Sequence, residues 1–157
     1  MRSCVAQGIA RGVGAACFLV LPVLLLGSWM TQAQAATSGG PSLAEARAAL
    51  FAHVDDAQQI AGGSWQSQDD PDSRGCTLPD GTSGRAYSVL RIASDPSATA
   101  IPLLTGEWTG LGYEVERAEI GPVTQLIATS ADGELLIFRA SDRAMTLQGE
   151  SECRPAS

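Results

Sequence analysis

The chain of 157 residues contains no lysine and a single histidine, His53. A serine, histidine and aspartate triad needs a histidine beside its nucleophile, and His53 falls beside the apolar stripe of a predicted helix. We interpret it as a solvated side chain on the helix surface. With this histidine excluded as a catalytic base, we expect a protein that is not an enzyme and that binds no metal or cofactor.

The sequence also lacks an apolar run long enough to span a bilayer comfortably. Its longest run, residues 15–30, has about 16 residues and includes a proline, whereas a membrane-spanning helix needs about 20. Two arginines precede this run and the small residues of AQA follow it at 33–35, which is the pattern of a signal peptide. We predict cleavage after Ala35, and hence a secreted or envelope-associated protein without membrane insertion. The alternative is a retained membrane anchor.

Cysteine is scarce once residues 1–35 are removed. Only Cys76 and Cys153 remain, so one intramolecular pairing is possible in an oxidising compartment. The alternatives are two free thiols or a metal site, but a metal site would need two more thiolates or imidazoles near these cysteines. We predict a disulfide between Cys76 and Cys153, which stabilises the fold by about 4 to 5 kcal/mol in the chain-entropy model.

Positive charge is scarce as well. Two of the ten basic residues precede the predicted cleavage site, whereas all 17 acidic residues follow it, so the predicted mature chain carries a net charge of −9. Such a chain repels nucleic acid and anionic membrane surfaces, which we exclude as partners. Its length fits one domain. We expect a flexible lead at 36–41 and a single domain at 42–157.

The first element after the lead is an amphipathic helix. Ser42 and Glu45 have the spacing of a capping box at its N-terminus. Gly62 and Gly63 end it. Its apolar residues recur at intervals of three and four, which predicts a buried stripe of Leu43, Ala46, Leu50, Val54 and Ala57.

Residues 64–84 have no regular periodicity and many turn formers. Such a long connection inside a small domain is typically functional or disordered, and Trp65 and Cys76 attach this one to the domain. The acidic residues at 69–75 begin like a calcium loop, but Arg74 stands at the third ligand position and a glycine at the twelfth. We therefore interpret the segment as a solvated acidic loop and a candidate binding surface.

The remaining pattern predicts a strand at 85–93, a helix capped by Thr99 and then four short strands. The fold is expected to be α+β, with both helices on one face of a mixed, mostly antiparallel five-stranded sheet and one disulfide. If the second helix joins parallel strands, both cysteines lie at the same end of the sheet. Whether the first strand pairs with the second or with the last stays open. The four later strands are expected at 112–120, 123–130, 134–140 and 143–148.

No motif for hydrolysis is complete. GTSGR at 81–85 leads into a strand, whereas an esterase nucleophile stands between a strand and a helix. Glu114 and Glu116 share a strand face, as a glycosidase pair would, but in so acidic a chain we interpret them as solvated. A small hydrolase is therefore the less favoured function.

The strand at 134–140 is apolar on both faces, so the face without helices needs a cover. We predict that Tyr87 and Val89 share this face with Leu136 or Phe138, that Arg91 and Arg139 form its rim, and that Trp65 belongs to a lid over it. The predicted function is a non-catalytic binding module for an unknown protein partner. The alternative is an accessory or structural subunit that is stabilised by self-association, as in a homodimer, or by a membrane complex.

Several features together resemble a known group of proteins. They are the signal peptide, the N-terminal helix, the tryptophan-containing loop before Cys76, a helix ending in tryptophan and LGY at 111–113, a hairpin at Asp132-Gly133, and the closing CRP at 153–155. This combination is similar to small exported actinomycete proteins described as hypothetical secreted or lipoprotein-like proteins. The resemblance implies export and a disulfide, and it implies no catalytic residues.

Overall fold

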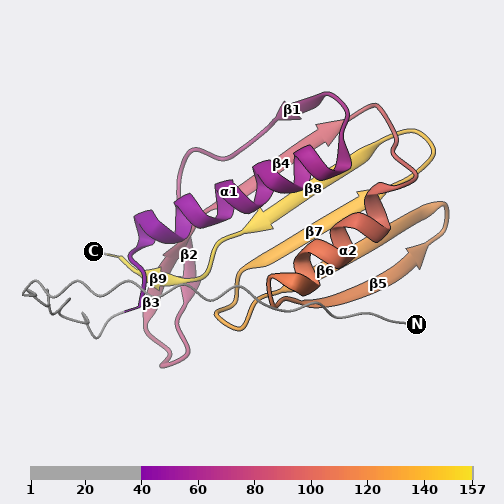
Figure 1. Ribbon diagram of the computed structural model, residues 1–157. Coiled ribbons are helices and arrows are strands. Elements are labelled where there is room, and N and C mark those ends of the chain that lie inside the picture. The colour runs from indigo at the N-terminus through magenta and orange to yellow at the C-terminus, as the bar shows by residue number, and fades with distance from the viewer. Residues whose placement is uncertain (1–39, 157) are drawn as a thin grey trace, which may run out of the picture. The chain divides into compact units, whose positions relative to one another are not determined.

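The computed structural model describes residues 40–156, which form two helices and nine strands (Figure 1). The predicted signal peptide and its cleavage site after Ala35 lie outside the described residues. The elements are α1 (Leu43–Ala61), β1 (Trp65–Ser67), β2 (Arg74–Thr77), β3 (Ser83–Ala86), β4 (Ser88–Ala93), α2 (Ala100–Gly110), β5 (Glu114–Ile120), β6 (Val123–Thr129), β7 (Leu135–Ala140), β8 (Met145–Glu150) and β9 (Arg154–Pro155).

Helix α1 forms for the reasons that its sequence indicates. The Ser42 hydroxyl accepts a hydrogen bond from the Glu45 amide at 3.3 Å, and the Glu45 carboxylate accepts one from the Ser42 amide at 2.7 Å, which confirms the capping box. The chain leaves the helix through Gly62 at φ 70°, a conformation that favours glycine. The residues of α1 that face the core are Ala46, Leu50, Val54, Ala57 and Ala61.

Helix α2 has the predicted buried stripe but not the predicted cap. Ile101, Leu104 and Trp108 are buried, and Pro102 lies in the first turn, where a missing N–H costs nothing. Thr99 precedes the helix, yet its hydroxyl makes no capping hydrogen bond and its backbone is already helical. The prediction of Thr99 as a side-chain cap was therefore wrong.

The main sheet has six strands in the order β1-β4-β8-β7-β6-β5, and every neighbouring pair is antiparallel. The fold is α+β, but the prediction of a mixed five-stranded sheet was wrong. Strand β4 runs parallel to β5 in direction, yet it pairs with the last long strand, β8. This answers the question of strand order, because the α2 connection carries the chain from one side of the sheet to the other.

The segment 64–84, predicted as a loop, supplies β1, β2 and part of β3. These strands are short and rich in polar and turn-forming residues, so they lack the alternation that identifies a strand. The predicted strand 85–93 is divided, because Ala86 ends β3 and Ser88 begins β4. Strand β3 belongs to a second, three-stranded antiparallel sheet in the order β2-β3-β9.

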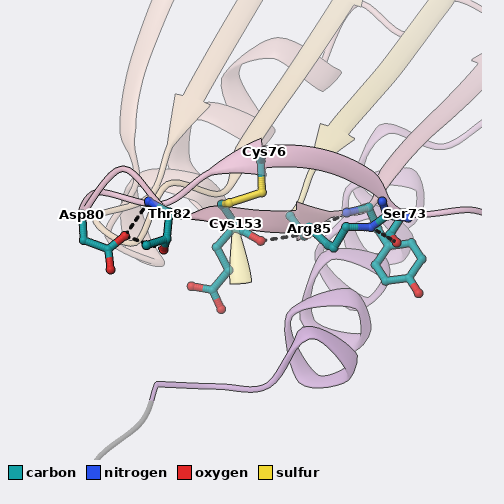
Figure 2. Close-up of a disulfide and its surroundings, with 9 residues drawn as sticks. Ser73, Cys76, Asp80, Thr82, Arg85 and Cys153 are labelled. Carbon is teal, nitrogen blue, oxygen red and sulfur yellow. Dashed lines mark hydrogen bonds between the residues drawn. A yellow bond between two sulfur atoms is a disulfide. The ribbon is translucent and has the colours of Figure 1, made fainter. Parts of the chain in front are cut away.

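The predicted disulfide is present and joins the second sheet to the end of the chain (Figure 2). Cys76 on β2 and Cys153, just before β9, have Cα atoms 6.0 Å apart. Gly84 of β3 lies beside this bridge, and a Cβ atom there would meet the Cys153 sulfur at 2.6 Å. Both cysteines thus lie at the same end of the main sheet, as the strand directions require.

Both helices cover one face of the main sheet, as predicted, and their apolar residues form one core with it (Figure 1). Helix α1 packs on β8, while α2 packs on β5 and β6. Gly149 of β8 permits the close approach of α1, because a Cβ atom at this position would lie 2.7 Å from a Leu50 methyl group. We call the opposite, helix-free side of this sheet the open face.

Candidate functional site

The structure reverses the predicted faces of the sheet. Val89, Leu136 and Phe138 were predicted on the open face, but their side chains are 4%, 0% and 0% exposed under the helices. The two-residue period had identified correctly which residues share a face. It did not identify which face the helices cover, and the assignment of these three residues to an exposed recognition surface was wrong.

Two other predicted residues also lie on the side of the helices. Tyr87 is half-buried between β3 and β4, with the Arg47 guanidinium 5.1 Å from its ring centre. Trp65 packs against the core and donates its Nε1 hydrogen to the Gly62 carbonyl at 2.8 Å. Trp65 therefore closes the end of α1 and does not cover the open face.

Arg91 is 7% exposed and forms an ion pair with Asp69. Burial lowers the pKa of its guanidinium, and the charge of Asp55 opposes this change. The Asp69 carboxylate also accepts the Leu90 amide at 3.0 Å, so it anchors the chain that follows β1 to the edge of β4. Arg91 therefore belongs to a buried ion pair, and the prediction that it forms the rim of the open face was wrong.

Arg139 is the member of the predicted set that does lie on the open face. Its Nε donates to the Gln125 side chain and its terminal nitrogen donates to the Gln148 side chain, both at 2.5 Å. These three residues stand on β6, β7 and β8 and make a polar ladder across the sheet. The ladder orients the Gln148 side chain, which contributes to the pocket described next.

The open face carries half-buried aliphatic side chains on three strands. Cross-strand partners share a face, so Leu90 of β4, Ile127 of β6 and Ile137 of β7 lie in one row with Gln148. Leu135 lies in the neighbouring row, opposite Glu150. This arrangement gives the helix-free face an apolar centre, as the sequence of β7 predicted, although with different residues.

One end of this apolar centre is a concave pocket of about 400 Å³. The segment 68–74 forms one wall, and strands β4, β8 and β7 form the floor. We call it the open-face pocket. Its lining comprises Gln68, Asp69, Asp70, Arg74, Ser88, Val89, Leu90, Leu135, Ile137, Gln148, Gly149 and Glu150.

The acidic segment that forms the pocket wall is organised by its own side chains. The Asp70 carboxylate accepts the Asp72 amide at 3.1 Å and two guanidinium hydrogens of Arg74 at 3.1 and 3.2 Å. The Asp72 amide, and then Arg74, lower the pKa of Asp70. Arg74 therefore takes the position that a cation would need, and within residues 40–156 no group of three potential metal ligands comes together.

A second polar cluster was missed by the sequence interpretation of His53. The Glu134 carboxylate, 6% exposed, accepts the Tyr113 hydroxyl at 2.7 Å, and His53 Nδ1 lies 2.8 Å from the same oxygen. Burial raises the pKa of the Tyr113 phenol far above its usual range, and the hydrogen bond to Glu134 raises it further. His53, whose side chain is 29% exposed, is thus partly buried and held by hydrogen bonds, so its interpretation as a solvated side chain on the helix surface was wrong.

The network joins α1, the residue before β5 and the turn before β7. His53 and Glu134 are 81 residues apart in sequence, so no local spacing predicts their contact. The Glu134 amide is in turn held by the Ser130 hydroxyl at 2.9 Å. None of the three residues lines the open-face pocket, and we assign the network a structural role.

The residues considered for hydrolysis are apart from this network. Ser83 lies in β3, paired with Thr77, and the chain continues into a strand as expected. Glu114 and Glu116 are exposed on β5.

Among the described residues, no helix is long and apolar enough to cross a membrane.

Comparison with known proteins finds one solved structure with a similar fold. No protein-family model matches the chain, and no curated protein matches it. The crystal structure of a DUF4853 family protein from Actinomyces odontolyticus is similar, with a TM-score of 0.52 and 16% sequence identity over 73% of this chain and 67% of that chain. At this identity the similarity shows the fold alone. The neighbour belongs to an uncharacterised family, and the similarity does not bear on export.

Proposed function

We propose that this protein is an exported, non-catalytic binding module whose binding site is the open-face pocket. The pocket itself is the observation that carries the proposal. Its volume lies within the range of ligand sites, and it combines an apolar floor of Leu90, Leu135 and Ile137 with polar groups of Gln148 and Glu150.

The disulfide supports the export part of the proposal. Cys76 and Cys153 are 77 positions apart, and bridges of this kind persist in oxidising compartments. A secreted or envelope location is consistent with this bridge and with the predicted signal peptide. The net negative charge of the chain disfavours nucleic acid and anionic lipid, which leaves a protein or small organic partner.

Site-specific cross-linking in the exporting cell tests the proposal. A photo-reactive amino acid replaces Ile137 in the pocket, and a matched variant carries it at Ile120, which is 55% exposed at the end of β5 and outside the pocket. We expect a discrete adduct from position 137 that is absent from position 120. Adducts from both positions, or from neither, would contradict a binding site in the pocket.

Self-association remains the alternative function. The same cross-linking experiment distinguishes it from binding to a different partner. An adduct of twice the monomer mass from position 137 would show that a second copy covers the open face. Size-exclusion chromatography with light scattering at micromolar concentration would then show a persistent dimer.

A further inference from the structure

The chain contains two aspartates that are followed by glycine, Asp80 and Asp132, and neither lines the open-face pocket. Such an aspartate can cyclise, because glycine has no side chain to obstruct the attack of its nitrogen on the carboxyl carbon. The attack forms a C–N bond and releases one water molecule, which gives a five-membered succinimide ring. A water molecule then opens the ring and leaves either aspartate or isoaspartate, so the two steps consume no other reagent.

Both aspartates lie in hairpin turns of the same geometry. In the first turn the Gly81 amide donates to the Leu78 carbonyl at 2.8 Å, and Gly81 has φ 84°. In the second turn the Gly133 amide donates to the Ser130 carbonyl at 3.1 Å, and Gly133 has φ 91°. In each turn the residue that accepts this bond also donates its own amide to the residue after the glycine at 2.9 Å. Because both aspartates are also exposed, their reactivity depends on what holds each carboxylate.

The Asp80 carboxylate is held by Thr82. It accepts the Thr82 amide at 2.9 Å and the Thr82 hydroxyl at 2.6 Å (Figure 2). The hydroxyl, and then the amide, lower the pKa of Asp80. Cyclisation starts from the protonated carboxyl group, whose hydroxyl leaves as water. Both hydrogen bonds therefore oppose it, since they fix the carboxylate and favour its ionised form.

The Asp132 carboxylate has no such contact. Glu134 occupies the position in this turn that Thr82 occupies in the first, but its amide donates to the Ser130 hydroxyl at 2.9 Å. The Glu134 side chain accepts the Tyr113 hydroxyl instead. Within residues 40–156, no group donates a hydrogen bond to the Asp132 carboxylate. This carboxyl group is therefore free to rotate toward the nitrogen of the following glycine.

We propose that Asp132 is a site of spontaneous isomerisation to isoaspartate, whereas Asp80 is protected by its own turn. Isoaspartate lengthens the backbone of the turn between β6 and β7 by one carbon atom. Two residues later stands Glu134, which binds Tyr113 and His53. The modification displaces this carboxylate and so weakens the contact of α1 with the turn as the protein ages.

Incubation in water enriched in heavy oxygen tests the proposal on the protein expressed from its full sequence and purified as processed. Each cycle of ring closure and opening introduces one heavy oxygen atom, and trypsin places the two aspartates in separate peptides, 75–85 and 118–139. We expect Asp132 to take up the label at least about tenfold faster than Asp80, because cyclisation of Asp80 must first break two hydrogen bonds to its carboxylate. In urea the two sites should take it up at similar rates.

Two variants connect the rates to the structure. Thr82→Val keeps the shape of the side chain but removes its hydroxyl, so we expect labelling of Asp80 to rise by about tenfold while Asp132 is unchanged. Asp132→Glu should prevent labelling at this position, because a glutamate would have to close a larger ring. Unchanged melting temperatures before incubation would show that both variants fold.

The thermal unfolding of the incubated protein tests the effect on Glu134. We expect a second transition at lower temperature whose amplitude grows with the labelled fraction, and no such transition in Asp132→Glu. Equal labelling of the two aspartates in the folded protein, faster labelling of Asp80, or no label at Asp132 would overturn the proposed site. A single unchanged transition in fully labelled protein would overturn the displacement of Glu134.

Discussion

At the scale of single residues, two buried positions control how the layers meet. Gly149 allows α1 to approach β8, and Glu134 ties α1 to the turn before β7 through His53 and Tyr113. Neither residue is marked by a motif, because each acts through groups distant in sequence. Substitutions can test both roles. The role of Gly149 is steric, whereas the role of Glu134 is electrostatic.

We expect Gly149→Ala to lower the free energy of unfolding by about 1 to 3 kcal/mol, since overpacking a core forces side chains or backbone to shift. The added methyl group would meet Leu50 at 2.7 Å, Val89 at 3.0 Å and Leu136 at 3.2 Å. Urea denaturation measures the change. Gly75→Ala in β2 is the control, because a Cβ atom there meets nothing within 4 Å, and equal effects of the two variants would contradict the steric explanation.

The raised pKa of Tyr113 predicts a loss of stability at alkaline pH. In the unfolded chain a tyrosine ionises near pH 10, whereas in the folded protein the phenol keeps its proton to higher pH. The unfolded state therefore loses its proton first, so the stability present below about pH 10 falls by up to about 1.4 kcal/mol per pH unit above it. Tyr113→Phe should remove this part of the slope when urea unfolding is measured from pH 8 to 11. Parallel curves for the two proteins would show that the phenol stays ionisable in the fold.

At the scale of elements, local hydrogen bonds hold the start of α1, and the disulfide holds the segment before β9. Helix α1 begins with a complete capping box, whereas α2 begins without a side-chain cap. The second sheet is small, and β9 has only two residues. The bridge between Cys76 and Cys153 joins β2 to the residue before β9 and so supplements the strand pairing of this sheet.

The two helix starts provide a matched test of capping. Ser42→Ala removes the acceptor for the Glu45 amide and should lower the free energy of unfolding by about 1 kcal/mol. Thr99→Ala should change it little, because the Thr99 hydroxyl makes no capping hydrogen bond. Thermal and urea unfolding of both variants measure the difference. A larger loss for Thr99→Ala would contradict the assignment of the caps.

Cys153→Ser should lower the free energy of unfolding by about 2 to 5 kcal/mol, the usual range for a native disulfide in a small secreted domain. The bridge closes a loop between positions 77 apart, so its removal releases much entropy in the unfolded chain. The double variant without both cysteines should lose about as much as the single one. Thiols that titrate in the unfolded, unreduced protein would show that the bridge is not formed in solution.

At the scale of the whole molecule, the disulfide is consistent with an extracytoplasmic protein, and the proposed function places binding on one face of the main sheet. All 17 acidic residues follow position 35, and both helices pack on one face of the main sheet, which leaves the opposite face without helices. The proposed binding site lies on the face of the main sheet that carries no helices. The core and the proposed pocket lie on different sides of the sheet and share only Val89 and Gly149.

Removal of the predicted signal peptide changes the whole molecule and can be tested directly. We expect exported protein to begin at Ala36, because the small residues at 33–35 follow an apolar run of signal-peptide length. Intact mass spectrometry of protein recovered outside the cytoplasmic membrane measures this. An uncleaved N-terminus in that material would indicate a retained anchor.

The sequence by itself determined the elements whose signals are local. The capping box of α1, the stripes of both helices and the turn at Gly133 were predictable, because backbone geometry and side-chain period act over a few residues. The disulfide was predictable for another reason: once the predicted signal peptide is left out, only two of the four cysteines can pair. These features also imply the α+β class, since they set the order of helices and strands.

The tertiary structure alone decided which sheet face is the core, which strands form from 64–84 and what His53 contacts. A period of two places Val89 and Leu90 on opposite faces but is the same whichever face the helices cover. The choice depends on close packing across the layers, as at Gly149, and on pairings between residues distant in sequence, such as His53 with Glu134. Such contacts stabilise the protein only once distant parts of the chain are packed together, so no local sequence pattern predicts them.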